Sequence, residues 1–163
     1  MNTREKILPL DQLRTRLAEE RRNGRQIVLA NGCFDLLHAG HVRFLEGARR
    51  EGDVLVVAIN SDESERQLKG EGRPVLPAEA RARLVAAVGA VDYVVIFEET
   101  SVERLLEQLR PDVHAKGTDY TVETVPERAT SQRLGIRVAI VGDPKGHSSG
   151  DLIERIRITN HAG

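Results

Sequence analysis

The amino-acid sequence predicts an α/β protein with a doubly wound parallel sheet between two helical layers, a three-layer sandwich. Short apolar runs rich in β-branched residues recur along the chain, and residues 54–59 form the clearest of them. Segments of helix length, with apolar residues at spacings of three and four, lie between these runs. Because parallel strands need crossover connections that cover both faces of their sheet, this alternation predicts a doubly wound sheet.

The elements are expected to alternate from one end of the chain to the other. Apolar runs predict strands at residues 27–30, 54–59, 93–97, 113–115 and 136–141. Helical spacing predicts helices at residues 10–24, 41–50, 77–88, 100–109 and 127–134, and a last one containing Leu152, Ile153 and Ile156. Thr100 and Glu103 have the spacing of a capping box. Gly70, Gly72 and Pro74 interrupt the pattern, so residues 69–76 are expected to form an exposed loop.

Length and charge indicate a single domain without a large field for polyanions. The 163 residues predict one domain, with residues 1–24 as a helical extension and residues 25–163 as the core. The 24 basic and 25 acidic residues leave a net charge of -1, which does not favour binding to nucleic acid. The single cysteine, Cys33, fits a reducing compartment. The sequence shows neither a signal peptide nor an apolar run of roughly 20 residues, so we expect a cytoplasmic protein without a membrane partner.

Two histidines follow the first predicted strand, at the start of the next predicted helix. In an open α/β sheet, ligands bind beyond the carboxyl ends of the strands, and there His38 and His41 flank Gly40. Backbone N–H groups at a helix N-terminus attract anions, and imidazole donors beside them would add hydrogen bonds to phosphate oxygens. Gly32 and Gly40 would let the main chain approach a nucleotide closely. The alternatives are a surface histidine with a helix-capping histidine, and a zinc site, which is disfavoured because no cluster of further ligands completes it.

This segment resembles the nucleotidyltransferase superfamily that carries the His-x-Gly-His signature, which includes cytidylyltransferases and phosphopantetheine adenylyltransferases. The motifs that carry the resemblance are Asn31-Gly-Cys-Phe-Asp-Leu-Leu-His-Ala-Gly-His41, Asn60-Ser-Asp62, Leu68-Lys-Gly70, Arg73-Pro74, Val91-Asp-Tyr-Val94 and Lys116-Gly-Thr-Asp-Tyr120. Together they are similar to the D-glycero-D-manno-heptose 1-phosphate adenylyltransferase branch, over roughly residues 5–157. The resemblance implies a Rossmann-like nucleotidyltransferase fold.

The resemblance also implies roles for individual residues. His38 and His41 would bind the nucleotide phosphates and stabilise charge that develops as the α-phosphate is attacked, and Lys69 would close over the phosphates. The residues implied in nucleotide binding are Asn31, Gly32, Cys33, Phe34, Asp35, Gly40, Asn60, Asp62, Arg81, Lys116, Gly117, Asp119, His147, Ser148 and Ser149. Mg²⁺ would accompany ATP as the cofactor, and no residue is assigned as a metal ligand.

Simpler interpretations stay open for several of these residues. Lys69 and Arg81 could be solvated side chains, and Asp35 could close an Asx turn after the strand. Cys33 is expected to be a small packed side chain, because the sequence shows no basic partner that would make it a nucleophile.

Two segments of the chain depart from the family pattern. Ser148 and Asp151 have capping-box spacing, which is compatible with a phosphate-binding turn before the last helix. Gly150 stands where a Ser or Thr is usual, which removes a hydroxyl contact but leaves the backbone donors. Thr118 stands where a glycine is usual, so the contacts with the sugar are less well defined.

The expected reaction is transfer of AMP from ATP to a sugar 1-phosphate, with heptose 1-phosphate as the favoured acceptor, which gives ADP-heptose for lipopolysaccharide biosynthesis and releases pyrophosphate. The alternatives are cytidylyl transfer to glycerol phosphate or another polyol phosphate, and a non-catalytic nucleotide-binding module. The resemblance implies ATP and a phosphorylated sugar as partners and is compatible with a homodimer. Some relatives carry a sugar kinase domain for which this chain has no room, so a separate kinase is expected to supply the sugar 1-phosphate.

Overall fold

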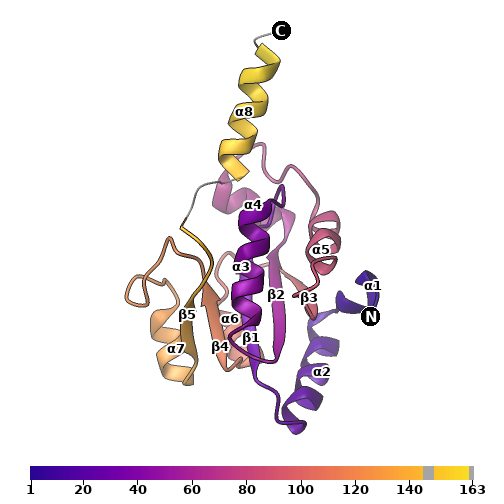
Figure 1. Cartoon of the computed structure of the whole chain (residues 1–163), viewed down its shortest axis with the longest axis vertical. Helices are drawn as coiled ribbons and strands as arrows, with labels where there is room; N and C mark the ends of the chain where they lie inside the picture. The colour runs from indigo at the N-terminus through magenta and orange to yellow at the C-terminus, as the bar shows by residue number, and fades with distance from the viewer. Residues whose placement is uncertain (145–148, 162–163) are drawn as a thin grey trace.

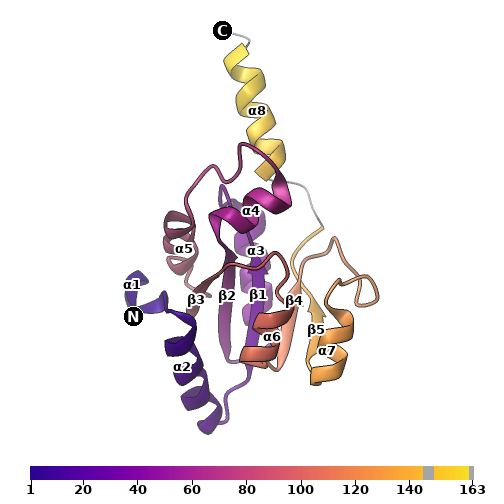
Figure 2. The same cartoon turned by 180° about the vertical axis from the view of Figure 1, so that it is seen from behind.

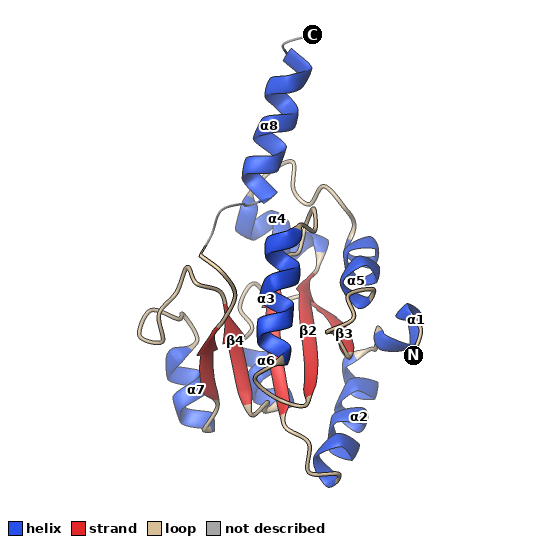
Figure 3. Cartoon of the chain, viewed as in Figure 1, coloured by secondary structure: helices blue, strands red, loops and turns tan. Residues whose placement is uncertain are grey.

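The computed structural model describes residues 1–144 and 149–161. Within these residues the sheet consists of β1 (Ile27–Gly32), β2 (Val54–Asn60), β3 (Tyr93–Phe97), β4 (Val113–Lys116) and β5 (Arg137–Ile140). The strands lie in the order β3-β2-β1-β4-β5, and each neighbouring pair is parallel. The sheet runs through the middle of the molecule between helices (Figure 3). The prediction of a parallel α/β fold is confirmed.

Helices cover both faces of the sheet. They are α1 (Thr3–Lys6), α2 (Leu10–Arg22), α3 (Ala39–Arg49), α4 (Asp62–Lys69), α5 (Ala78–Ala86), α6 (Glu103–Leu109), α7 (Arg128–Leu134) and α8 (Ser149–His161). One face carries α3 and α5, and the other carries α2, α6 and α7 (Figures 1 and 2). The short helix α4 lies at the carboxyl edge of the sheet, and α8 extends away from the layers (Figure 1). None of the described helices is long and apolar enough to cross a bilayer.

The sheet divides the core into two apolar clusters. Side chains alternate between the two faces along a strand, so Val28 and Ala30 of β1 belong to the same cluster as Leu45 of α3. Leu29 belongs to the opposite cluster, together with Leu17 of α2. Every residue of β2 is buried, as expected for a central strand that is covered on both faces. The N-terminal helix α2 is thus part of a helical layer.

The direction of winding reverses beside β1. From β1 the chain crosses to β2 and β3 on one side, and it later places β4 and β5 on the other side. In such sheets, the carboxyl ends of the strands at the reversal border a crevice that binds ligands. The segments that follow β1, β2 and β4 contain most of the predicted site residues, and parallel pairing brings these segments to one edge of the sheet.

The predicted strands and helices occur in the predicted order, with boundaries shifted by a few residues, but α1 and α4 were not expected. The buried side chains of α4 are Ser64 and Glu65, so this helix has no apolar periodicity by which to recognise it. The capping box expected at Thr100 and Glu103 is wrong. Glu103 is the first residue of α6, and its N–H is donated to Ser101 Oγ instead.

Candidate active site

The N-terminus of α3 is built around the two predicted histidines. His38 is the N-cap residue, and its Nδ1 accepts the N–H of Gly40 at 3.1 Å. Nδ1 of His41 accepts the N–H of His38 at 3.2 Å, and the two rings stack with their centroids 3.8 Å apart. This reciprocal capping satisfies N–H groups that a helix start otherwise leaves unpaired. Helix capping is therefore one role of the pair.

The capping bonds determine which ring nitrogens can donate to a ligand. Because Nδ1 of His38 and of His41 accepts a hydrogen bond, the proton of each neutral ring is on Nε2. Each Nε2–H then lies on the opposite side of the ring from the capping bond. Gly40 leaves room for this arrangement, because a Cβ at this position would lie 2.9 Å from Cε1 of His38. Capping therefore uses Nδ1 of both rings, and Nε2 is the nitrogen that would donate in the predicted phosphate contacts.

Phe34 supports the histidines within the turn that follows β1. Its ring centroid lies 5.4 Å from that of His41 and 6.4 Å from that of Phe44. The ring is almost fully buried, although Phe34 has a φ of 51°, in the left-handed region that bulky residues rarely adopt. A Cβ on Gly32 would come within 3.1 Å of this ring. Gly32 and Phe34 thus shape the turn, and their predicted contacts with nucleotide stay predictions.

A buried carboxylate fixes the loop between α4 and α5. Asp35 accepts the N–H groups of Val75 at 2.7 Å and Leu76 at 3.0 Å. It also accepts Nε–H of Arg73 at 3.1 Å. Burial by itself raises the pKa of Asp35, but these donors outweigh burial and hold that pKa below its usual range. Asp35 therefore connects the turn after β1 to the loop that follows Lys69.

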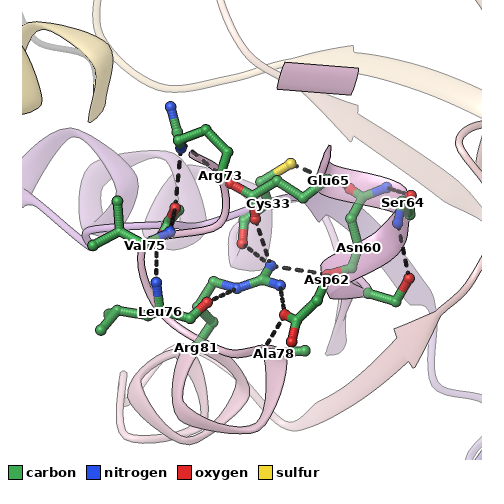
Figure 4. Close-up of polar contacts among 12 residues, drawn as sticks. Cys33, Asn60, Asp62, Ser64, Glu65, Arg73, Val75, Leu76, Ala78 and Arg81 are labelled. Atoms are coloured by element: carbon green, nitrogen blue, oxygen red, sulfur yellow. Dashed lines mark hydrogen bonds and ion pairs between the residues drawn. The ribbon is translucent and has the colours of Figure 1, made fainter. Parts of the chain in front are cut away.

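Arg81 of α5 lies at the centre of this edge and has no exposed surface (Figure 4). Its Nη1 donates to the carbonyl oxygens of Cys33 at 2.7 Å and Asn60 at 2.9 Å. Its Nε donates to the carbonyl oxygen of Leu76, and its Nη2 to Asp62 Oδ1, each at 2.9 Å. Arg81 is therefore not the solvated side chain that the sequence left open. Its burial among protein acceptors favours a structural role over the predicted phosphate contact.

Glu65 of α4 completes a buried charge cluster that consists of Asp35, Glu65, Arg73 and Arg81. Glu65 Oε2 lies 3.1 Å from Arg81 Nη1, and Oε1 lies 3.2 Å from Arg73 Nη2. Burial raises the pKa of Glu65 to about 7, against the lowering effect of the Arg81 charge. The roles of Glu65 and Arg73 were not predicted from the sequence. The available signal was Ser61, which caps α4 just before an acidic first turn.

Cys33 and Asn60 form side-chain hydrogen bonds at the same carboxyl edge of the sheet. The Cys33 thiol donates to Asn60 Oδ1 at 3.7 Å, and Asn60 Nδ2 donates to Ser64 Oγ at 2.8 Å. Burial, aided by the charge of Glu65, raises the pKa of Cys33 to about 11. The thiol is therefore protonated at neutral pH, which agrees with the expected packing role. Lys69, the last residue of α4, is exposed at this edge.

A second group of predicted residues lies at the carboxyl end of β4. Lys116, the last residue of that strand, is almost buried, with its Nζ 3.8 Å from Glu127 Oε2 and 4.7 Å from the centroid of the Tyr120 ring. Gly117 and Asp119 follow in the loop, and Asp119 is exposed. Lys116 is thus paired within the protein, beside the strand that carries Asn31.

The predicted phosphate-binding turn falls largely outside the described part of the chain. His147 and Ser148 lie outside the described residues, and so does the capping box between Ser148 and Asp151. Ser149 is the first residue of α8, but its side chain is not described. Across residues 1–144 and 149–161, no group of three or more His, Cys, Asp or Glu side chains is placed to hold a metal ion. The role of Mg²⁺ stays a prediction.

The carboxyl edge therefore combines imidazole donors, the start of a helix and an exposed lysine, which suits a phosphorylated ligand. The model of the cytidylyltransferase-like family matches residues 29–155. The chain belongs to this family. The matched residues include His38, His41 and Lys69, together with the whole buried charge cluster.

Similar proteins agree with this assignment. The chain is 47% identical over 151 residues to the bifunctional protein HldE of Syntrophotalea carbinolica and 46% identical over 151 residues to that of Geobacter sulfurreducens. Each comparison covers 93% of this chain and 31% of the relative, so the chain spans about a third of the length of these relatives. The crystal structure of the lipopolysaccharide core biosynthesis protein from Thermoplasma volcanium GSS1 shares the fold, with a TM-score of 0.64 and 23% identity over 75% of this chain and 100% of that one. The family and the relatives indicate a nucleotidyltransferase enzyme.

Proposed function

We propose that this chain transfers AMP from ATP to D-glycero-D-manno-heptose 1-phosphate, forming ADP-heptose and pyrophosphate. The observation that carries the proposal is the histidine pair at the N-terminus of α3, where Nδ1 of His38 and of His41 accepts a capping N–H and each neutral ring therefore carries its proton on Nε2. The choice of acceptor is supported by the motif similarity to the heptose 1-phosphate branch and by the identity to proteins named HldE.

The reaction joins a phosphate oxygen of the sugar 1-phosphate to the α-phosphorus of ATP and breaks the bond from that phosphorus to the oxygen bridging to the β-phosphate. Because the substrate phosphate is already a nucleophile, positioning and charge neutralisation suffice, without a covalent enzyme intermediate. In the proposal, His38 and His41 donate through Nε2 to the phosphate oxygens, and Lys69 supplies a positive charge. Mg²⁺ enters with ATP and neutralises charge on the phosphates, and no protein ligand is assigned to it.

The proposed closure of Lys69 over the phosphates is supported by the chain that follows it. Gly70 and Gly72 have φ angles of 94° and 83°, and a Cβ on either would meet no atom within 4 Å. From Val75 onward the loop is anchored by Asp35. The segment that can rearrange is therefore short, which limits the proposed motion to Lys69 and its neighbours.

Cytidylyl transfer to a polyol phosphate is the second candidate, and the description of the matched family as cytidylyltransferase-like favours it. The fold and the histidine signature serve both reactions equally. The base and the acceptor distinguish the two candidates, so both substrates must be varied in the same assay.

The assay supplies Mg²⁺ with ATP or CTP, and heptose 1-phosphate of either anomer or glycerol 3-phosphate as acceptor. Pyrophosphate is followed by a coupled reaction, and the nucleotide product is identified by mass spectrometry. We expect the highest kcat/KM for ATP with heptose 1-phosphate. CDP-glycerol as the favoured product would replace the proposal by the second candidate. ATP binding by calorimetry, without pyrophosphate from any pair, would indicate a non-catalytic module.

Variants of single histidines test the residues assigned to this reaction. His41→Ala removes one Nε2 donor and is expected to lower kcat roughly 10²- to 10³-fold, as for other donors that stabilise transition-state charge. His161 is exposed in α8 and provides the matched control. His161→Ala should retain the wild-type kcat. Equal activity of the two folded variants would contradict the role of His41.

A further inference from the structure

A histidine that the proposed mechanism does not use lies inside the protein next to the site. His114 belongs to β4, where its Cα pairs with that of Leu29 in β1, and it has no exposed surface. Its Nε2 lies 2.8 Å from Oδ1 of Asn31. Asn31 is half-buried near the carboxyl end of β1. It lies two residues before Cys33, whose carbonyl oxygen accepts a hydrogen bond from Arg81. His114 thus contacts a residue at the edge of the site from the interior of the protein.

This contact determines the protonation of the imidazole. An amide oxygen only accepts hydrogen bonds, so Nε2 of His114 carries the ring proton and Nδ1 carries none. Nδ1 is buried, and no group in the described part of the chain bonds to it. Burial, with the charge of Lys116 as a second cause, lowers the pKa of His114 to about 3. The ring is therefore neutral at neutral pH, and its one proton is donated to Asn31.

The same contact determines which end of the Asn31 amide faces outward. Because Oδ1 is directed at His114, the Nδ2 group is directed away from it. Among the residues that the structure describes, no protein acceptor is found for Nδ2. An amide Nδ2 donates to phosphate or hydroxyl oxygens, and both oxygen types occur in ATP and in heptose 1-phosphate.

We propose that His114 is a positioning residue, which holds the Asn31 carboxamide so that Nδ2 donates to an oxygen of the bound substrate. The inference rests on the proposed function and adds to it a residue that does not itself touch the substrate. Packing alone explains this histidine poorly. An apolar side chain at position 114 would fill the strand without leaving a buried nitrogen unpaired, an arrangement that lowers stability.

Variants of His114 separate positioning from packing. His114→Leu removes both the donor and the unpaired nitrogen, whereas His114→Gln keeps an N–H donor of similar reach. Both kcat and KM are measured with ATP and with heptose 1-phosphate varied in turn, and thermal unfolding is followed for each variant. We expect His114→Leu to lower kcat/KM roughly 10- to 100-fold, because a misplaced contact weakens transition-state binding. Its unfolding temperature should not fall, and His114→Gln should recover most of the lost activity.

A double variant tests whether His114 acts through Asn31. If it does, adding His114→Leu to Asn31→Ala has little further effect, because the two changes remove the same interaction. The inference is overturned if the decrease in kcat/KM of the double variant equals the product of the decreases of the two single variants. It is also overturned if His114→Leu has wild-type kinetics. Absence of turnover by the wild type with every acceptor would count against the proposed function instead.

A measurement that needs no turnover tests the contact itself. Nitrogen-15 NMR of the His114 ring should show a proton on Nε2 and none on Nδ1 from about pH 5 to about pH 9, because the ring stays neutral over that range. A proton on Nδ1, or a ring that becomes charged within this range, would overturn the inference whatever the activity of the protein.

Discussion

His38 uses its two ring nitrogens for different tasks. Nδ1 caps α3 by accepting the N–H of Gly40, and Nε2 is the proposed phosphate donor. The neighbouring His41 repeats this division, since its Nδ1 accepts the N–H of His38. A change that removes only one nitrogen of His38 can therefore separate the stability of the helix from the chemistry of the site.

The variant His38→Asn makes this separation. Asparagine is among the best N-cap residues, but it has no atom at the position of Nε2. We expect a loss of stability well below about 1 kcal/mol and a decrease in kcat of roughly 10²-fold or more, measured by urea unfolding and steady-state kinetics. His38→Ala is the comparison, and it should lose about 1 kcal/mol as well as activity. Wild-type kcat in folded His38→Asn would mean that this histidine only caps the helix.

Glu65 predicts a pH dependence of stability. Its pKa is raised by burial to about 7 in the folded protein, so the folded chain binds this proton more tightly than the unfolded chain does. The resulting stabilisation is complete below the unfolded pKa and is lost as the pH rises through about 7. Gln at this position resembles the protonated form and cannot ionise. The difference in unfolding temperature, Glu65→Gln minus wild type, should therefore increase as the pH is raised from about 5.5 to about 8.5.

The control for this prediction is Glu63→Gln, because Glu63 is exposed on the same helix. Its unfolding temperature relative to wild type should change little over the same pH range. If the difference for Glu65→Gln falls as the pH rises, the ion pairs of Glu65 with Arg73 and Arg81 outweigh its burial.

Among the elements, α5 contributes to the geometry of the edge mainly through Arg81, which bonds to the ends of β1 and β2. Arg81→Met would leave these carbonyl oxygens and the carboxylate of Glu65 without their shared partner. We expect a loss of about 3–5 kcal/mol, the usual result of removing one partner of a buried ion pair. Arg83 is exposed on the same helix, and Arg83→Met should change stability by no more than about 0.5 kcal/mol. Equal stability of both variants in urea would show that Glu65 compensates by taking up a proton.

The elements differ in how well sequence alone predicts them. Strands such as β2 could be predicted because burial on both faces produces a continuous apolar run. The start of α3 could be predicted because the histidine motif and the helix start coincide. The helix α4 could not, because it buries Ser64 and Glu65, and the arginines that make Glu65 tolerable come from other segments. The burial of Arg81 could not be predicted for the same reason, since Cys33, whose carbonyl oxygen it contacts, lies 48 residues away.

At the scale of the whole molecule, the N-terminal helix belongs to the same packing unit as the sheet. Leu13 and Leu17 of α2 have no exposed surface, and they share an apolar cluster with Leu29 of β1 and Leu106 of α6. The hydroxyl of Tyr93 in β3 also donates a hydrogen bond to Glu20 of α2. Although the sequence suggested an extension beside a core, this packing predicts that α2 unfolds together with the sheet.

Leu17→Ala tests that cooperativity. Truncating a fully buried leucine should lower the free energy of unfolding by about 2–5 kcal/mol and shift one common transition. The control is Leu84→Ala on α5, where the leucine is 44% exposed and the expected change is within about 0.5 kcal/mol. Unfolding in urea is followed by circular dichroism and by amide exchange in α2 and β2. Exchange of α2 amides at urea concentrations that leave β2 protected would contradict a single unit.

Arg81 holds carbonyl oxygens of Cys33, Asn60 and Leu76, and every amino acid brings the same carbonyl to the main chain. Mutations that replace these three side chains would therefore leave the acceptors of Arg81 in place, although they would remove the side-chain bonds of Cys33 and Asn60. The separation between the ends of β1 and β2 thus depends on Arg81 and on main-chain atoms, and not on the side chains that would contact an acceptor substrate.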